Sequence, residues 1–141
     1  MTADLTFTRD FDAPRELVFK VFMDPAHFVR FWGPAGTHTP ASSVVIEPWA
    51  GGRFENVMVS DADGSSYAFH ATFLEVVEPL RFSWKEHHSG LTSQTTLIDL
   101  GDDRTRIVIH QTDVPEGYRS PEARAGFQTA LDRLAAHLAT L

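Results

Sequence analysis

The chain has 141 residues, of which 43% are hydrophobic, 11% aromatic and 22% charged, a size and composition typical of one globular domain rather than two. It contains no cysteine, which excludes disulfides and thiolate metal sites. The formal net charge of −7 argues against a nucleic acid partner, because a phosphate backbone would be repelled.

The N-terminal region predicts one strand and two short helices. Residues 5–11 alternate between apolar and polar side chains, as in a half-buried strand. Asp12 can cap a following helix and Pro14 suits its first turn. The apolar face of that helix is formed by Leu17, Val18, Val21 and Phe22. Asp24 and Pro25 repeat the signal for a second helix, which the segment 33–36 ends. This second helix carries Phe28, Phe31 and Trp32.

Between residues 42 and 112, short β-branched and aromatic runs alternate with turn clusters, which predicts an antiparallel meander. The expected strands are Val44–Trp49, Arg53–Val59, Ser66–Val77, Leu80–His87, Thr92–Leu100 and Thr105–Thr112. Their connections are short enough for hairpins.

A long C-terminal helix follows, with Ser120 as its cap and Pro121 in its first turn. Its apolar stripe consists of Ala123, Phe127, Leu131, Leu134, Leu138 and Leu141. This helix is long enough to cross a sheet of six or seven strands. We therefore predict one α+β domain spanning residues 1–141, in the order strand, two helices, six strands and helix, whose curved sheet wraps the last helix.

Side-chain alternation assigns an aromatic-rich inner face to the sheet. The residues expected to face inward are Phe54, Asn56, Met58, Tyr67, Phe69, Ala71, Phe73, Glu75, Phe82, Trp84, Glu86, Thr105, Ile107, Ile109 and Gln111. In the strand from Thr92, both alternations are compatible with the pattern. Such an inner face suits an apolar pocket as well as a solid core.

Metal and cofactor sites are not predicted. The seven histidines show neither His-x-His nor paired i, i+4 spacing, and the chain has no phosphate-cradling loop and no Gly-x-Ser-x-Gly motif. No hydrophobic run is long enough for a membrane span or a signal-peptide core. We therefore expect a soluble cytoplasmic protein.

Two carboxylates, Glu75 and Glu86, are the weak candidates for catalysis. On an apolar inner face, a carboxyl group would have a raised pKa and could act as a general acid or base. Alternatively, both lie near strand ends and reach solvent or pair with Arg53, Arg81 or Lys85. No nucleophile and base form a recognisable pair, so the sequence favours a protein that is not an enzyme.

A series of short motifs, in this order, resembles the SRPBCC or START-like superfamily and, within it, the group named for the activator of Hsp90 ATPase (Aha1-like). The motifs are Phe11-Asp12-Ala13-Pro14, Leu17-Val18-Phe19, Asp24-Pro25, Phe31-Trp32-Gly33-Pro34, Gly51-Gly52-Arg53-Phe54, Asp63-Gly64, Phe73-Leu74-Glu75-Val76, Glu78-Pro79-Leu80-Arg81-Phe82, Gly101 with Thr105, and Leu131-Asp132-Arg133-Leu134. The resemblance covers nearly the whole chain.

This resemblance implies a helix-grip (Bet v 1/START-like) fold, in which a seven-stranded antiparallel sheet wraps the C-terminal helix and leaves a cavity. The superfamily includes lipid and small-ligand carriers, cyclases and co-chaperones. Here Gly126-Phe127 replaces the usual Gly-Trp and Ala71 replaces a glycine, two changes that would reshape the cavity wall. The eukaryotic activator has a separate Hsp90-binding domain, for which 141 residues leave no room, so chaperone activation is not expected.

The leading functional hypothesis is that the cavity binds a small hydrophobic ligand. The expected ligand-binding residues are Trp32, Phe54, Asn56, Met58, Phe69, Phe73, Glu75, Phe82, Trp84, Ile109, Gln111, Phe127 and Leu131. The alternatives are a cyclase- or hydrolase-like enzyme that uses Glu75 or Glu86, and an interaction module that acts on a chaperone. A monomer and a homodimer through an edge strand are both compatible with the sequence.

Overall fold

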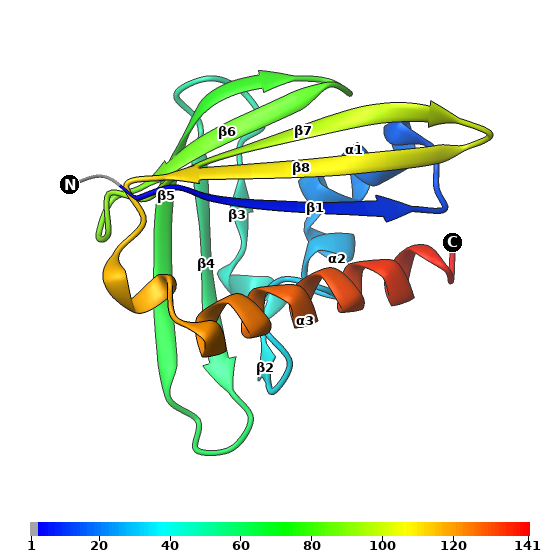
Figure 1. The fold of residues 1–141 in the computed structure, drawn as a ribbon. Helices are drawn as coiled ribbons and strands as arrows, with labels where there is room; N and C mark the ends of the chain where they lie inside the picture. Colours follow the sequence, from blue (N-terminus) through cyan, green and yellow to red (C-terminus); the bar gives the residue numbers. More distant parts are fainter. Residues whose placement is uncertain (1–2) are drawn as a thin grey trace.

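A computed structural model describes residues 3–141 (Figure 1). The strands are β1 (Leu5–Phe11), β2 (Thr37–His38), β3 (Val45–Ile46), β4 (Arg53–Ser60), β5 (Ser66–Val77), β6 (Arg81–Glu86), β7 (Thr92–Gly101) and β8 (Arg104–Thr112). The helices are α1 (Arg15–Met23), α2 (Pro25–Phe28) and α3 (Pro121–Leu138), with short 3₁₀ turns η1 (Ala41–Ser43) and η2 (Glu116–Tyr118).

One antiparallel sheet has the strand order β1-β8-β7-β6-β5-β4-β2, and β3 also pairs with β4. The sheet curves, and α3 crosses its inner side (Figure 1). In the view of Figure 1, α1 and α2 lie behind the C-terminal half of α3. This arrangement confirms the predicted α+β helix-grip fold.

The sheet has eight strands within the described residues instead of the predicted seven. The additional strand, β2, pairs with the end of β4, and it is short because Pro40 follows closely and has no N–H group for the ladder. The predicted strand Val44–Trp49 is reduced to β3, because the chain turns back toward β4 at Gly51, whose φ is +85°. A Cβ atom at the next residue, Gly52, would collide with the carbonyl oxygen of Glu47.

The inner side of β7, which the sequence left open, is formed by Ser93, Thr95 and Leu97, and all three are buried. On the opposite side of the interior, the buried face of α3 consists of Leu131, Leu134 and Leu138. The predicted helical stripe is too long at its C-terminal end, because α3 ends at Leu138 and Leu141 is exposed.

The predicted caps are confirmed at two of the three helices. The Asp24 side chain accepts a hydrogen bond from the Ala26 N–H in α2, and Ser120 Oγ accepts one from the Ala123 N–H in α3. The prediction for Asp12 is wrong, because β1 extends to Phe11 and α1 begins only after Pro14. Asp12 is therefore too far from the first turn to cap it, and its carboxylate pairs with Arg104 at 3.0 Å.

Replacing Ser120 with alanine is expected to lower the free energy of unfolding by about 1 kcal/mol, because a donor in the first turn of α3 loses its acceptor. Urea unfolding followed by circular dichroism measures the change. Ser66→Ala, at an exposed position at the start of β5, is the matched control and should be close to neutral. An equal loss in both variants would show that the cap does not contribute specifically.

A histidine pair joins α2 to the last turn of α3, with His27 Nδ1 2.9 Å from His137 Nε2. Burial, together with the charges of His27 and Arg30, lowers the pKa of His137. The unfolded chain, in which this pKa is ordinary, therefore binds more protons in mildly acidic solution, so acid favours unfolding.

We expect the contribution of His137 to stability to fall as the pH drops through about 6.5 and to level off below the lowered pKa. The His137→Gln variant should accordingly show a smaller difference between urea midpoints measured at about pH 7.5 and about pH 5.5. The exposed His88 provides the control variant, His88→Gln, which should keep the full difference. If His137→Gln also keeps the full difference between the two midpoints, the protonation of His137 does not contribute to the pH dependence of stability.

Candidate functional site

Aromatic rings occupy the interior between the sheet and the helices. Phe54 on β4 is central to them: its ring centroid lies 5.0 Å from that of Phe73, 5.4 Å from those of Phe69 and Trp32, and 5.8 Å from that of Trp84. The strand register explains the grouping, because Phe54 pairs with Ala71, so the neighbouring inward positions on β5 are Phe69 and Phe73.

The other predicted ligand-binding residues are only partly gathered here. Phe82 packs instead against Phe19 and Phe22 of α1, with centroid distances of 6.0 and 5.2 Å. Ile109 and Gln111 lie beside β1, where they pair with Phe7 and Leu5. From α3, Leu131 is buried, and Phe127 stacks on Phe7 with 4.2 Å between centroids. Met58 is half-buried and packs against the core.

The inward position of Glu75 is a wrong prediction. A bulge between Phe73 and Glu75 shifts the register with β6 and reverses the alternation beyond it. The Glu75 side chain is 47% exposed, and its carboxylate pairs with Arg81 at 2.6 Å. Val76 takes the inward place and packs against the core.

Among the described residues, two polar side chains near these rings have buried atoms without hydrogen bonds. Asn56 is 1% exposed, and neither its amide nitrogen nor its amide oxygen has a partner among the described residues. The indole Nε1 of Trp32, whose ring packs on Phe54 and Phe69, is likewise unpartnered within this part of the chain. Buried donors and acceptors of this kind each cost about 1–3 kcal/mol, so they mark a place where a polar group could bind.

The second candidate carboxylate, Glu86, is 2% exposed, which agrees with its inward position in the strand alternation and contradicts the alternative in which it reaches solvent. One of its oxygens accepts a hydrogen bond from the Tyr67 hydroxyl and the other accepts one from Ser89, both at 2.6 Å. The Tyr67 hydroxyl also lies 3.3 Å from that of Tyr118 in η2. Burial and the hydrogen bond to Glu86 raise the pKa of Tyr67, so its phenol stays protonated and acts as a donor.

Sequence reasoning missed Ser89, which donates to Glu86, and Tyr118, whose hydroxyl lies near that of Tyr67. Ser89 belongs to the hairpin turn after β6, and only its position three residues after Glu86 hints at the contact. Tyr118 comes from the segment before α3, and no local pattern connects it with Tyr67 on β5.

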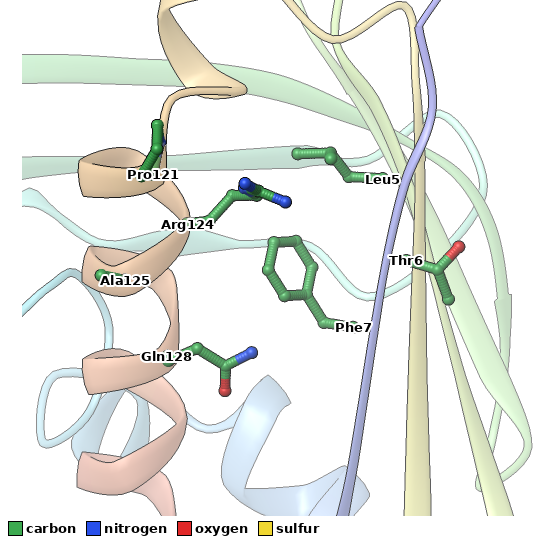
Figure 2. Close-up of a pocket in the computed structure, with 7 residues that line it drawn as sticks. All are labelled: Leu5, Thr6, Phe7, Pro121, Arg124, Ala125 and Gln128. Carbon is green, nitrogen blue, oxygen red and sulfur yellow. The ribbon is translucent and has the colours of Figure 1, made fainter.

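Two open pockets lie away from these rings. The first, of about 360 Å³, lies between β1 and α3 and is lined by Leu5, Thr6, Phe7, Pro121, Arg124, Ala125 and Gln128 (Figure 2). The second, of about 510 Å³, lies beside α1 and is lined by Glu16, Phe19, Lys20, Met23, Asp24, Pro48, Val76 and Glu78. Neither pocket has a lining residue from the predicted ligand-binding set.

The described residues contain no group of three histidine, aspartate or glutamate side chains arranged to hold a metal ion. Within the same residues, every helix is too short or too polar to cross a membrane.

Comparisons with known proteins agree with the fold. A protein from Chromobacterium violaceum is 24% identical with a TM-score of 0.87, covering 95% of this chain and 96% of its own. The AHSA1 protein from Silicibacter pomeroyi is 25% identical with a TM-score of 0.80, covering 98% and 99%. An AHSA1-like protein from Aeromonas hydrophila is 20% identical with a TM-score of 0.82, covering 98% and 93%.

A search of the curated proteins found no match. The family model of the activator of Hsp90 ATPase homolog 1-like proteins matches residues 12–139, nearly the whole chain. The motifs, the fold and this match agree, and the chain belongs to the activator of Hsp90 ATPase homolog 1-like family.

Proposed function

We propose that this protein binds a small, mainly apolar ligand in the interior between the sheet and α3, with a polar group of the ligand held by Asn56 and Trp32. The observation that supports this function most directly is the Asn56 amide, which is 1% exposed and has no hydrogen-bond partner among residues 3–141. A ligand group that satisfies it removes a desolvation penalty that the unliganded fold bears.

The donor and acceptor pattern limits the ligand chemistry. The Asn56 amide offers donors and an acceptor, while the Trp32 indole is a donor only. A carboxamide or hydroxyl group, which can both accept and donate, complements this pair. The surrounding rings favour an aromatic or acyl body, because they supply apolar contact area and edge-to-face stacking. Trp32 and Met58 are only half-buried and provide the side from which a ligand can enter.

Displacement of the fluorophore 1-anilinonaphthalene-8-sulfonate tests this proposal. We expect 1-naphthamide to displace the fluorophore at a lower concentration than 1-methylnaphthalene, which has the same rings but no amide. Asn56→Leu should abolish this preference, whereas Gln94→Leu, at an exposed position on β7, should retain it. The proposal fails if no fluorophore is displaced or if the preference survives in Asn56→Leu.

Acid–base catalysis at Glu86 is the second candidate function, favoured by a carboxylate that is buried and held by two hydroxyl donors. Turnover of 4-nitrophenyl acetate and butyrate tests it. Activity above background should disappear in Glu86→Gln and persist in Glu75→Gln, since Glu75 is exposed on the outer side. The absence of turnover, or equal activity in both variants, would contradict hydrolysis at Glu86.

A further inference from the structure

The pocket between β1 and α3 combines an apolar wall with a single cationic side chain. Leu5 and Phe7 project from β1 toward α3, and Arg124 extends from α3 into the space between them (Figure 2). Its volume of about 360 Å³ lies within the usual range for small-molecule sites.

The arginines on the strands each have a carboxylate partner, whereas within the described residues those outside the strands, Arg124 among them, do not. Arg9, Arg53, Arg81, Arg104 and Arg106 each pair with a carboxylate. Within residues 3–141, Arg124 has no carboxylate oxygen within ion-pair distance. Its guanidinium therefore retains its donors for an external anion, and a planar fork of donors suits a carboxylate.

Gln128, one turn further along α3, has its amide orientation set by a neighbour. The Arg9 guanidinium donates a hydrogen bond to Gln128 Oε1 at 2.8 Å, and Arg9 is itself held by Asp132. With its oxygen engaged, the amide directs its NH2 group to the side of Phe7 and Arg124 (Figure 2). The pocket thus has two sets of donors, one turn apart on the same face of α3.

We propose that this pocket binds a small amphipathic monocarboxylate. The ligand carboxylate lies between the Arg124 guanidinium and the Gln128 amide NH2, and its hydrocarbon body packs on Leu5, Phe7 and Ala125. A monoanion fits better than a phosphate dianion, because the pocket supplies one positive charge and the chain as a whole carries a net charge of −7. This site is separate from the proposed interior site and shares no residue with it.

Isothermal titration of the full chain with octanoate tests the proposal, with octanol and octylamine as ligands of equal chain length. We expect octanoate to bind at least about tenfold more tightly than either, because only the carboxylate forms charge-assisted hydrogen bonds. Arg124→Gln should raise the octanoate dissociation constant about tenfold and remove the preference over octanol. The charge-matched control is Lys85→Gln, at an exposed position on β6. It should change neither the octanoate dissociation constant nor the preference for octanoate over octanol.

Circular dichroism checks that Arg124→Gln is folded before its affinity is compared, and Gln128→Leu provides an independent loss of the second donor. Equal binding of octanoate and octanol, or unchanged octanoate affinity in Arg124→Gln, overturns the proposal. Octanoate binding that is lost in Asn56→Leu but retained in Arg124→Gln also overturns it and assigns the ligand to the interior instead. Failure of the interior site alone, seen as no displacement by 1-naphthamide, leaves the octanoate result unaffected.

Discussion

Replacing Phe54 with alanine is expected to lower the free energy of unfolding by about 3–5 kcal/mol, the largest effect expected of any single substitution considered for this protein. The Phe54 ring lies 5.0 to 5.8 Å, centroid to centroid, from the rings of Phe28, Trp32, Phe69, Phe73 and Trp84. Its removal loses the free energy gained when the ring is transferred from water to the interior. It also leaves a cavity that the surrounding rigid rings cannot readily fill.

Urea unfolding measured by far-ultraviolet circular dichroism tests this expectation. Phe54→Leu keeps most of the apolar volume and should cost markedly less than Phe54→Ala. Trp49→Ala removes an even larger ring, but Trp49 is 57% exposed, so this variant should stay close to the parent protein. A loss below about 1 kcal/mol in Phe54→Ala would show that the interior rearranges freely around the missing ring.

Replacing Asn56 with leucine is expected to raise the free energy of unfolding by about 1–2 kcal/mol. The substitution exchanges an amide that is 1% exposed and unpartnered among the described residues for an apolar side chain of similar shape. The same change should weaken binding of an amide-bearing ligand, so stability and binding should move in opposite directions, as they do where a fold retains a costly polar group for function.

Thermal unfolding with and without 1-naphthamide separates the two effects. The parent protein should gain stability from the ligand, whereas Asn56→Leu should begin with a higher midpoint and gain little. Gln94→Leu serves again as the control, because its exposed position on β7 should leave both the midpoint and the ligand response unchanged. A lower midpoint for ligand-free Asn56→Leu would contradict the interpretation, because it would mean that the amide stabilises the fold itself.

Local patterns in the sequence were sufficient for the architecture. Alternation placed Phe54 and Phe69 on the inner face, and the proline that follows Ser120 located the start of α3. These features depend on backbone geometry within a few residues, because strand side chains alternate with a period of two and a cap acts only on the adjacent turn. The buried state of Glu86 was predictable for the same reason.

The failures share a different physical origin. Glu75 was assigned inward by an alternation that a bulge interrupts, and a bulge depends on the pairing with the neighbouring strand rather than on one strand alone. Asp12 has the right residue type for a cap, but the length of β1 decides where α1 begins. In each case, the structure at this position depends on a contact or an element outside the short stretch of sequence from which the prediction was made.

By itself, the sequence determined the order of the elements apart from β2, the α+β class and most of the inner face, all of which follow from short-range periodicity. Only the tertiary structure decided that the Asn56 amide lacks a partner in the described part of the chain, that Tyr67 and Ser89 hold Glu86, and that Arg124 extends toward β1. The physical reason is that hydrogen bonds, burial and pockets are made between segments far apart in the chain, and no local pattern encodes which side chains meet there.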